Sequence, residues 1–145
     1  MLTRHRGNFQ WDDVAVLAYK EEGTHFKNIT RQVLFDGLAD VPCQLRYFEI
    51  EPAGYSTLEQ HQHVHLVIIL RGQGDVLLGQ HIHHVAQNDV IAIPPHTWHQ
   101  FQATGEDSLG FLCLVNQERD KALRPTEDEL HLLCEIPKIA AFIRS

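Results

Sequence analysis

A succession of short β-type runs, separated by turn residues, constrains the fold of this sequence more than any other feature. From about Gln32 onward, branched and aromatic residues alternate with polar ones in stretches such as CQLRYFEIE, HLVIILRG and LGFLCLV. Glycine, proline, asparagine and aspartate interrupt these runs at intervals of roughly ten residues. Many short strands at that spacing are typical of an antiparallel sandwich or barrel. We therefore expect an all-β protein.

The two ends of the chain differ from this β-rich centre. Residues 8–31 show no sustained period of either kind, and we expect an arm that packs on the barrel. After Val115 the β pattern does not return, and Thr126 with Glu129 forms a capping box that predicts a short helix, with a possible break at Pro137. The predicted organisation is one domain over residues 1–145, with an arm 1–31, a barrel core of about 32–116 and a helical tail 117–145.

Composition excludes several classes of function. A net charge of −7 with only twelve Lys and Arg provides no basic patch for phosphate backbones, so we expect no nucleic-acid partner. No apolar run approaches the roughly 20 residues of a membrane span, and the N-terminus lacks the apolar stretch of a signal peptide. The three cysteines are odd in number and form no CxxC pair, which favours reduced thiols and the cytoplasm.

The eleven histidines are unusual, and their clustering matters more than their number. Four ligand-capable side chains occupy every second position of EQHQHVH: Glu59, His61, His63 and His65. On one straight strand the first and last of these would lie about 20 Å apart. Either a turn falls inside the run, or only some of the four bind one ion. We favour a bend around residues 62–64, with His65 opening the next strand.

A fourth ligand from elsewhere in the chain would complete such a site, and His99 in PPHTWHQF is the best candidate. Imidazoles with one carboxylate suit one divalent transition metal, such as manganese, iron, nickel or zinc, and leave positions open for substrate. An isolated HxH is more often a surface or core feature than a ligand pair, so the distant His99 strengthens the case. We interpret His63, within the bend, as lining the pocket.

The stretches GYSTLEQHQHVHLVIILRGQG and NDVIAIPPHTWHQF resemble the two motifs of the cupin superfamily, over roughly residues 45–115. The resemblance implies a double-stranded β-helix, a jelly-roll barrel with a metal in its mouth. Counting back from Gly72 places the ligands at Glu59, His61 and His65, with Glu and His exchanged relative to the usual motif. Counting forward from Gly54 gives a register that is one residue off.

Several further residues are candidates for contact with a substrate. Cys113 could present its thiol to the pocket as a catalytic residue if alternate residues of FLCLV face inward; otherwise it is a small buried side chain. Arg46 and Tyr47 are neighbours on one predicted strand, so only one of them faces the metal. With Phe101 and His63, these two complete the predicted substrate-binding set.

Three other stretches, WDDVAVLAYKEEGTHFKNITRQVLF, LRYFEIEPAGYSTLE and LGFLCLVNQERDK, resemble a subgroup of small single-domain bacterial cupins. The subgroup includes the methylthioxylulose-phosphate methylsulfurylases, manganese-dependent enzymes of methylthioadenosine salvage. The resemblance implies transfer of a methylthio group from a methylthio-sugar phosphate to a thiol. A bound phosphate needs cationic or amide donors, which Arg46, Arg31 or Lys27 would have to supply.

Two other functions remain open at the level of sequence. The same four ligands could serve a cupin dioxygenase or a sugar isomerase, and a barrel without turnover could bind or store a metal or a metabolite. In each case the expected partner is a small molecule. Cupins commonly pair through their barrel edges, so we expect a homodimer.

Overall fold

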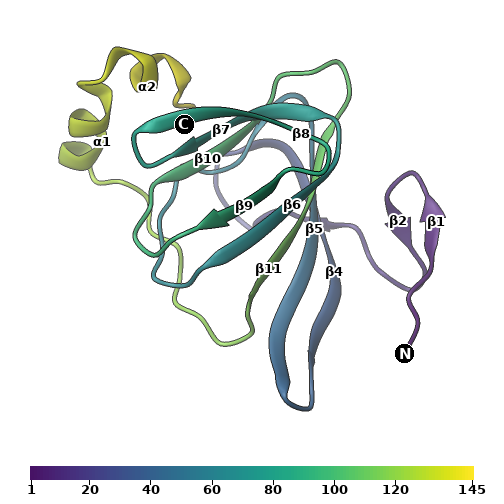
Figure 1. Ribbon diagram of the computed structural model, residues 1–145. Coiled ribbons are helices and arrows are strands. Elements are labelled where there is room, and N and C mark those ends of the chain that lie inside the picture. The colour runs from purple at the N-terminus through teal and green to yellow at the C-terminus, as the bar shows by residue number, and fades with distance from the viewer.

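The computed structural model describes residues 1–145, and a curled antiparallel sheet of nine strands dominates it. Seven strands follow one another in the order β8-β7-β10-β5-β11-β6-β9, and β4 and β3 continue from β5 (Figure 1). The expected all-β jelly-roll architecture is confirmed, and the predicted helical tail consists of two short helices. The elements are β1 His5–Gly7, β2 Gln10–Trp11, β3 Leu17–Ala18, β4 Lys27–Leu38, β5 Val41–Tyr55, β6 His65–Arg71, β7 Gln73–Leu78, β8 His81–Ala86, β9 Val90–Ile93, β10 His99–Ala103, β11 Leu109–Asn116, α1 Glu127–Cys134 and α2 Pro137–Phe142.

The interior of the barrel follows from the alternation of side chains along each strand. In β11, the side chains of Phe111, Cys113 and Val115 are buried, and the residues between them are partly exposed. This strand pairs with β5 on one side and with β6 on the other, so that Cys113 lies opposite both Arg46 and Val67. The inward residues of these three strands contribute to a core of fifteen buried side chains.

The N-terminal arm packs on the outer face of β5. Phe9 stacks on Tyr47 with ring centroids 5.5 Å apart, and Trp11 contacts the same ring at 5.1 Å. The Gln32 side chain donates a hydrogen bond of 2.8 Å to the carbonyl of Phe9. The short hairpin β1–β2 therefore lies outside the barrel, beside the long β4–β5 hairpin (Figure 1).

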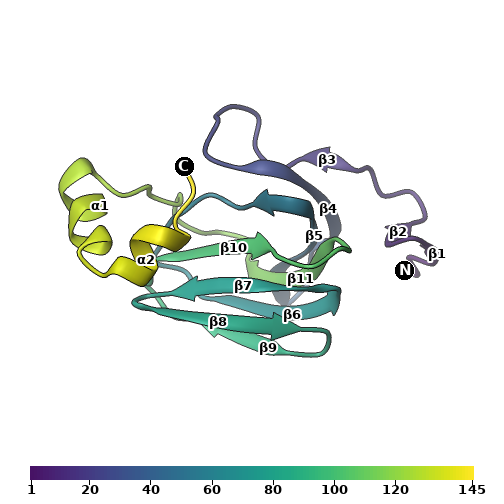
Figure 2. The same cartoon turned by 90° about the horizontal axis from the view of Figure 1, so that it is seen from above.

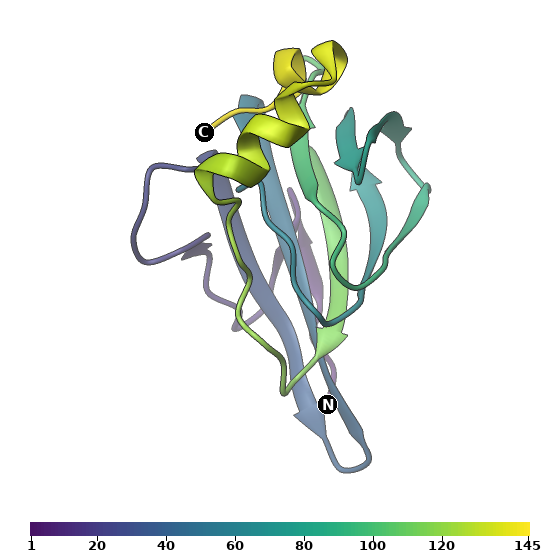
Figure 3. The same ribbon diagram turned by 90° about the vertical axis from the view of Figure 1, so that its left-hand side faces the viewer.

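The C-terminal helices close one end of the sheet (Figures 2 and 3). Thr126 and Glu129 form the predicted capping box of α1, and α2 follows directly after the break at Ile136. Ile139 and Phe142 pack with Leu77 of β7 in a second, smaller apolar cluster. Neither helix has the length or the apolar character needed to cross a membrane.

Candidate metal centre

Three imidazoles from separate parts of the barrel converge at one point. His61 follows the short bridge between Glu59 and His99, His65 opens β6, and His99 opens β10. One ring nitrogen from each lies within 4.8 Å of the others. The chain bends at residues 62–63 between His61 and His65, within the bend that we expected around residues 62–64. A hydrogen bond of 2.8 Å from the amide of His96 to the carbonyl of His61 supports this bend.

The hydrogen bonds of two rings leave a nitrogen lone pair free for a metal. Nδ1 of His61 lies 2.6 Å from the carbonyl oxygen of His63, and Nδ1 of His99 lies 2.9 Å from that of Thr97. Because a carbonyl only accepts, Nδ1 carries the proton in both rings and Nε2 is an acceptor. Nε2 of His61 is buried and has no hydrogen-bond partner. A divalent cation satisfies such a nitrogen, so these residues fit a metal.

Burial also keeps the three rings neutral. It is the main reason that the pKa of His61 falls to about 4, with the nearby His99 and His63 as further causes. The pKa values of His65 and His99 are lowered as well, again mainly by burial. Metal ligation by imidazole requires the neutral form, so the cluster is ready to bind at neutral pH without losing protons first.

Glu59 shares the cavity but is engaged differently. Its carboxylate is largely buried and lies 2.6 Å from the ammonium of Lys20, which reaches in from the segment between β3 and β4. The group of three nitrogens within 4.8 Å does not include it. Glu59 would have to exchange Lys20 for a metal in order to act as the fourth ligand.

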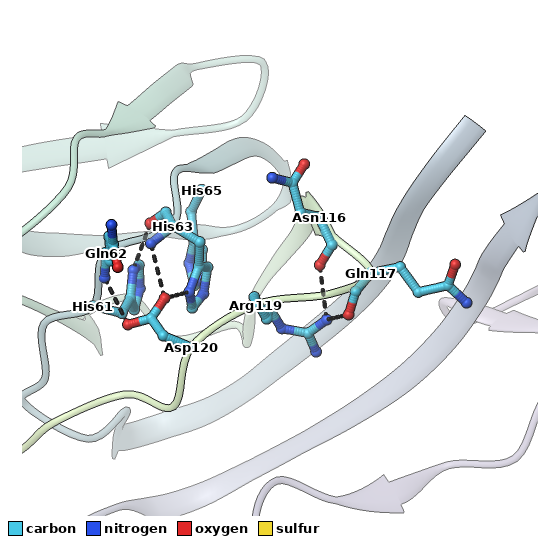
Figure 4. A network of polar contacts seen from close by, with 8 residues as sticks. All are labelled: His61, Gln62, His63, His65, Asn116, Gln117, Arg119 and Asp120. Carbon is cyan, nitrogen blue, oxygen red and sulfur yellow. Dashed lines mark hydrogen bonds and ion pairs between the residues drawn. The ribbon is translucent and has the colours of Figure 1, made fainter. Parts of the chain in front are cut away.

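His63 and Asp120 lie beside the rings of His61 and His65 (Figure 4). Nε2 of His63 lies 3.0 Å from Nε2 of His65, and Nδ1 of His63 lies 2.6 Å from Asp120. The Asp120 carboxylate also accepts the backbone amides of Gln62 at 2.8 Å and of His63 at 3.0 Å. These hydrogen bonds, that from Gln62 first, lower the pKa of Asp120. Asp120 therefore fixes the bend that carries the cluster.

The imidazoles open into a cavity of about 340 Å³. Apolar side chains such as Phe101 and Phe111 form part of its wall, and their rings stack at 4.6 Å. The buried thiol of Cys113 also lines it, and Nη2 of Arg46 donates to this sulfur at 3.3 Å. Burial raises the pKa of Cys113, and the charge of Arg46 opposes that rise.

Two candidates from the sequence, Tyr47 and Lys27, lie elsewhere. Tyr47 is buried on the opposite face of β5, where its hydroxyl donates to Glu49 at 2.8 Å, and burial raises its pKa. Lys27 does not line the cavity either, whereas Arg31 does. The other candidates all line this one cavity: Arg46, Glu59, His61, His63, His65, His99, Phe101 and Cys113.

Sequence reasoning missed four charged residues that line the cavity: Lys20, Arg119, Asp120 and Lys121. They come from the arm and from the irregular segment after β11, where no periodic pattern assigns a direction to a side chain. Three of the four lie in the NQERDK stretch, which resembles the subgroup of small cupins.

Comparison with known proteins agrees with this barrel fold. The family described as "Cupin domain" matches residues 46–115, which span β5 to β11 with the whole histidine cluster. The chain belongs to the cupin family. A curated relative, 1-methylthio-D-xylulose 5-phosphate methylsulfurylase of Rhodospirillum rubrum, is 48% identical over 139 residues, which cover 95% of this chain and 88% of the relative.

Solved structures extend the likeness to the whole chain. A cupin 2 conserved barrel domain protein from Rhodopseudomonas palustris superposes with a TM-score of 0.94 at 47% identity, and all of both chains is covered. A cupin-2 domain from Rhodospirillum rubrum gives a TM-score of 0.87 at 48% identity, covering 95% of this chain and 93% of the other. The arm and the helical tail are therefore shared with these relatives.

Proposed function

We propose that this protein is a metal-dependent enzyme that transfers the methylthio group of a methylthio-sugar phosphate to a thiol. The observation that carries the proposal is the 48% identity to the methylsulfurylase over 95% of the chain. Three features of the cavity support it: a cluster of neutral imidazoles, a buried thiol and several cationic side chains, all facing the same space. The same ligands on another cupin could serve other chemistry, so the proposal rests on the match along the whole chain.

The metal would be one divalent transition ion, manganese, iron, nickel or zinc, held by His61, His65 and His99, with Glu59 as a fourth ligand. Such an ion acts as a Lewis acid that stabilises negative charge developing beside a carbonyl group. The carbonyls of His63 and Thr97 accept hydrogen bonds from Nδ1 of two of the rings, which would leave Nε2 of each ring to hold the ion. The apolar wall around Phe101 limits the access of water.

Cys113 is the residue that we propose to receive the methylthio group. Its sulfur attacks the sulfur of the substrate, the carbon–sulfur bond of the sugar breaks, and the electron pair stays on the carbon, which then takes up a proton. The product on the protein is a mixed disulfide between Cys113 and the methylthio group. A small thiol from solution releases that group by thiol–disulfide exchange and restores Cys113. Arg46, which donates to Sγ, favours the thiolate form that this attack requires.

The test is turnover of 1-methylthio-D-xylulose 5-phosphate by the chain reconstituted in turn with manganese, ferrous iron, nickel and zinc. With glutathione present, mass spectrometry should detect the deoxy-sugar phosphate and the methylthio-glutathione disulfide. Cys113→Ser should abolish turnover, and Cys43→Ser, which alters a thiol that does not line the cavity, should retain it. Absence of product with all four metals would contradict the proposed reaction.

A further inference from the structure

Arg46 is a buried cation without an anionic partner. It lies on β5, is 9% exposed and lines the cavity. One of its nitrogens donates to the thiol of Cys113, and its guanidinium lies 4.9 Å from the ring centre of Phe48. Its Nε is buried and has no hydrogen-bond partner. A thiol and an aromatic ring are weak partners for a guanidinium, so a full positive charge is left poorly compensated in the wall of the barrel.

Two more guanidiniums line the same cavity. Arg119, from the segment after β11, donates to the carbonyls of Asn116 and Gln117 at 2.9 and 3.1 Å (Figure 4) and to the side chain of Gln44 at 2.9 Å. All of these partners are neutral. Its pKa is lowered, first by burial and then by the charge of Arg46. Arg31, on β4, donates from Nε to the carbonyl of Ala18 at 3.2 Å.

The acidic side chains that line the cavity do not neutralise these arginines. Glu59 pairs with Lys20, and Asp120 accepts hydrogen bonds from the bend at residues 62–63. None of the ion pairs of the protein involves Arg31, Arg46 or Arg119. In a chain with a net charge of −7, three unpaired guanidiniums around one cavity are a marked local excess of positive charge.

We infer that Arg46, with Arg31 and Arg119, forms an anion subsite that binds the phosphate of the substrate, an inference that rests on the proposed function. A guanidinium presents planar, fork-shaped donors that match phosphate oxygens, and it stays charged when desolvated. Arg46 supplies its unpartnered Nε, and the neutral partners of Arg119 hold that side chain at the cavity. A phosphomonoester dianion supplies the missing counter-charge.

The subsite also sets the direction in which the substrate lies. Across the sheet, Arg46 of β5 is opposite Cys113 of β11, and Cys113 is opposite Val67 of β6, two residues beyond His65. The thiol thus lies between the arginine and the histidine cluster. A substrate with its phosphate at Arg46 therefore extends past the sulfur of Cys113 toward the imidazoles, so that its carbonyl end, which also carries the methylthio group, lies on the metal side of that thiol.

Inorganic phosphate is the direct probe, titrated by calorimetry into the full chain in excess EDTA so that no metal contributes to binding. Arg46→Met should weaken binding about 10- to 100-fold, the effect of losing charge-assisted hydrogen bonds, and Arg46→Lys should recover part of it. Arg119→Met should also weaken binding, and it stands in for Arg46→Met if circular dichroism shows that variant to be unfolded. Arg71→Met is the matched control, because Arg71 pairs with Glu49 away from the cavity. This variant should bind phosphate with the affinity of the wild type.

Kinetics separate this inference from the proposed reaction. In the metal-loaded enzyme, Arg46→Lys should raise KM for the phosphorylated substrate more than KM for the unphosphorylated sugar, because only the phosphorylated substrate loses a phosphate contact. Arginine-dependent phosphate binding without any turnover of the wild type would support the subsite and contradict the reaction. Turnover by the wild type, combined with equal phosphate affinity in Arg46→Met, Arg119→Met and the wild type, would overturn the subsite.

Discussion

Removing the metal should make the protein unusually sensitive to mild acid, and His61 allows the effect to be calculated. Burial lowers the pKa of His61 to about 4 in the folded chain, whereas an unfolded histidine titrates near about 6.5. Below that pH the unfolded chain binds a proton that the folded chain does not, so stability falls as the pH drops toward 4. At about pH 5 this proton lowers the free energy of unfolding by about 2 kcal/mol. Allowing for solvent screening of the charge, we expect about 1 to 2 kcal/mol.

The assay is urea unfolding in EDTA at about pH 7.5 and about pH 5, on the wild type, His61→Gln and His81→Gln. His81 is exposed on β8 and serves as the matched control. The loss of unfolding free energy on acidification should be about 1 to 2 kcal/mol smaller in His61→Gln than in the wild type. In His81→Gln this loss should equal that of the wild type. An equal loss in all three proteins would refute the account of a neutral, buried cluster.

Three further predictions concern the supports of the site and the assembly. Asp120→Asn should weaken metal affinity about 10- to 100-fold in a chelator competition, since Asp120 holds the bend that carries His63 and the cluster. An affinity equal to that of the wild type would show that the bend is stable without Asp120. Phe101→Ala should lower the free energy of unfolding, measured by urea titration, by about 3 to 5 kcal/mol, because Phe101 is 4% exposed and stacks on Phe111. A loss below about 1 kcal/mol would mean that the apolar wall of the cavity repacks around the missing ring. We also propose a homodimer, so light scattering should give twice the mass of the chain, and a monomer at micromolar concentration would reject it.

The parts of the site that the sequence predicts are those fixed by local spacing. His61 and His65 lie on either side of a bend because alternation on a straight strand would separate them, and the structure has that bend. The register of the ligand motif came instead from the resemblance to the cupin motif, counted back from Gly72. The fold class followed from strand alternation and turn residues, which act over a few residues at a time.

The remainder depends on contacts between distant segments. Alternation shows that Arg46 and Tyr47 face opposite sides of β5, but it does not show which side is inside. The arm decides this, because Phe9 and Trp11 cover Tyr47 and so leave Arg46 to the cavity. The pairing of Glu59 with Lys20, 39 residues away, has no periodic signature in the sequence.

Elemental analysis of the untagged protein, beside His61→Ala and His99→Ala, tests the metal centre most directly. The account predicts about one equivalent of a transition metal in the wild type and its loss in both variants, because each variant removes one of three converging ligands. Less than about a tenth of an equivalent in the wild type, even after reconstitution with manganese, iron, nickel and zinc, would contradict the metal centre.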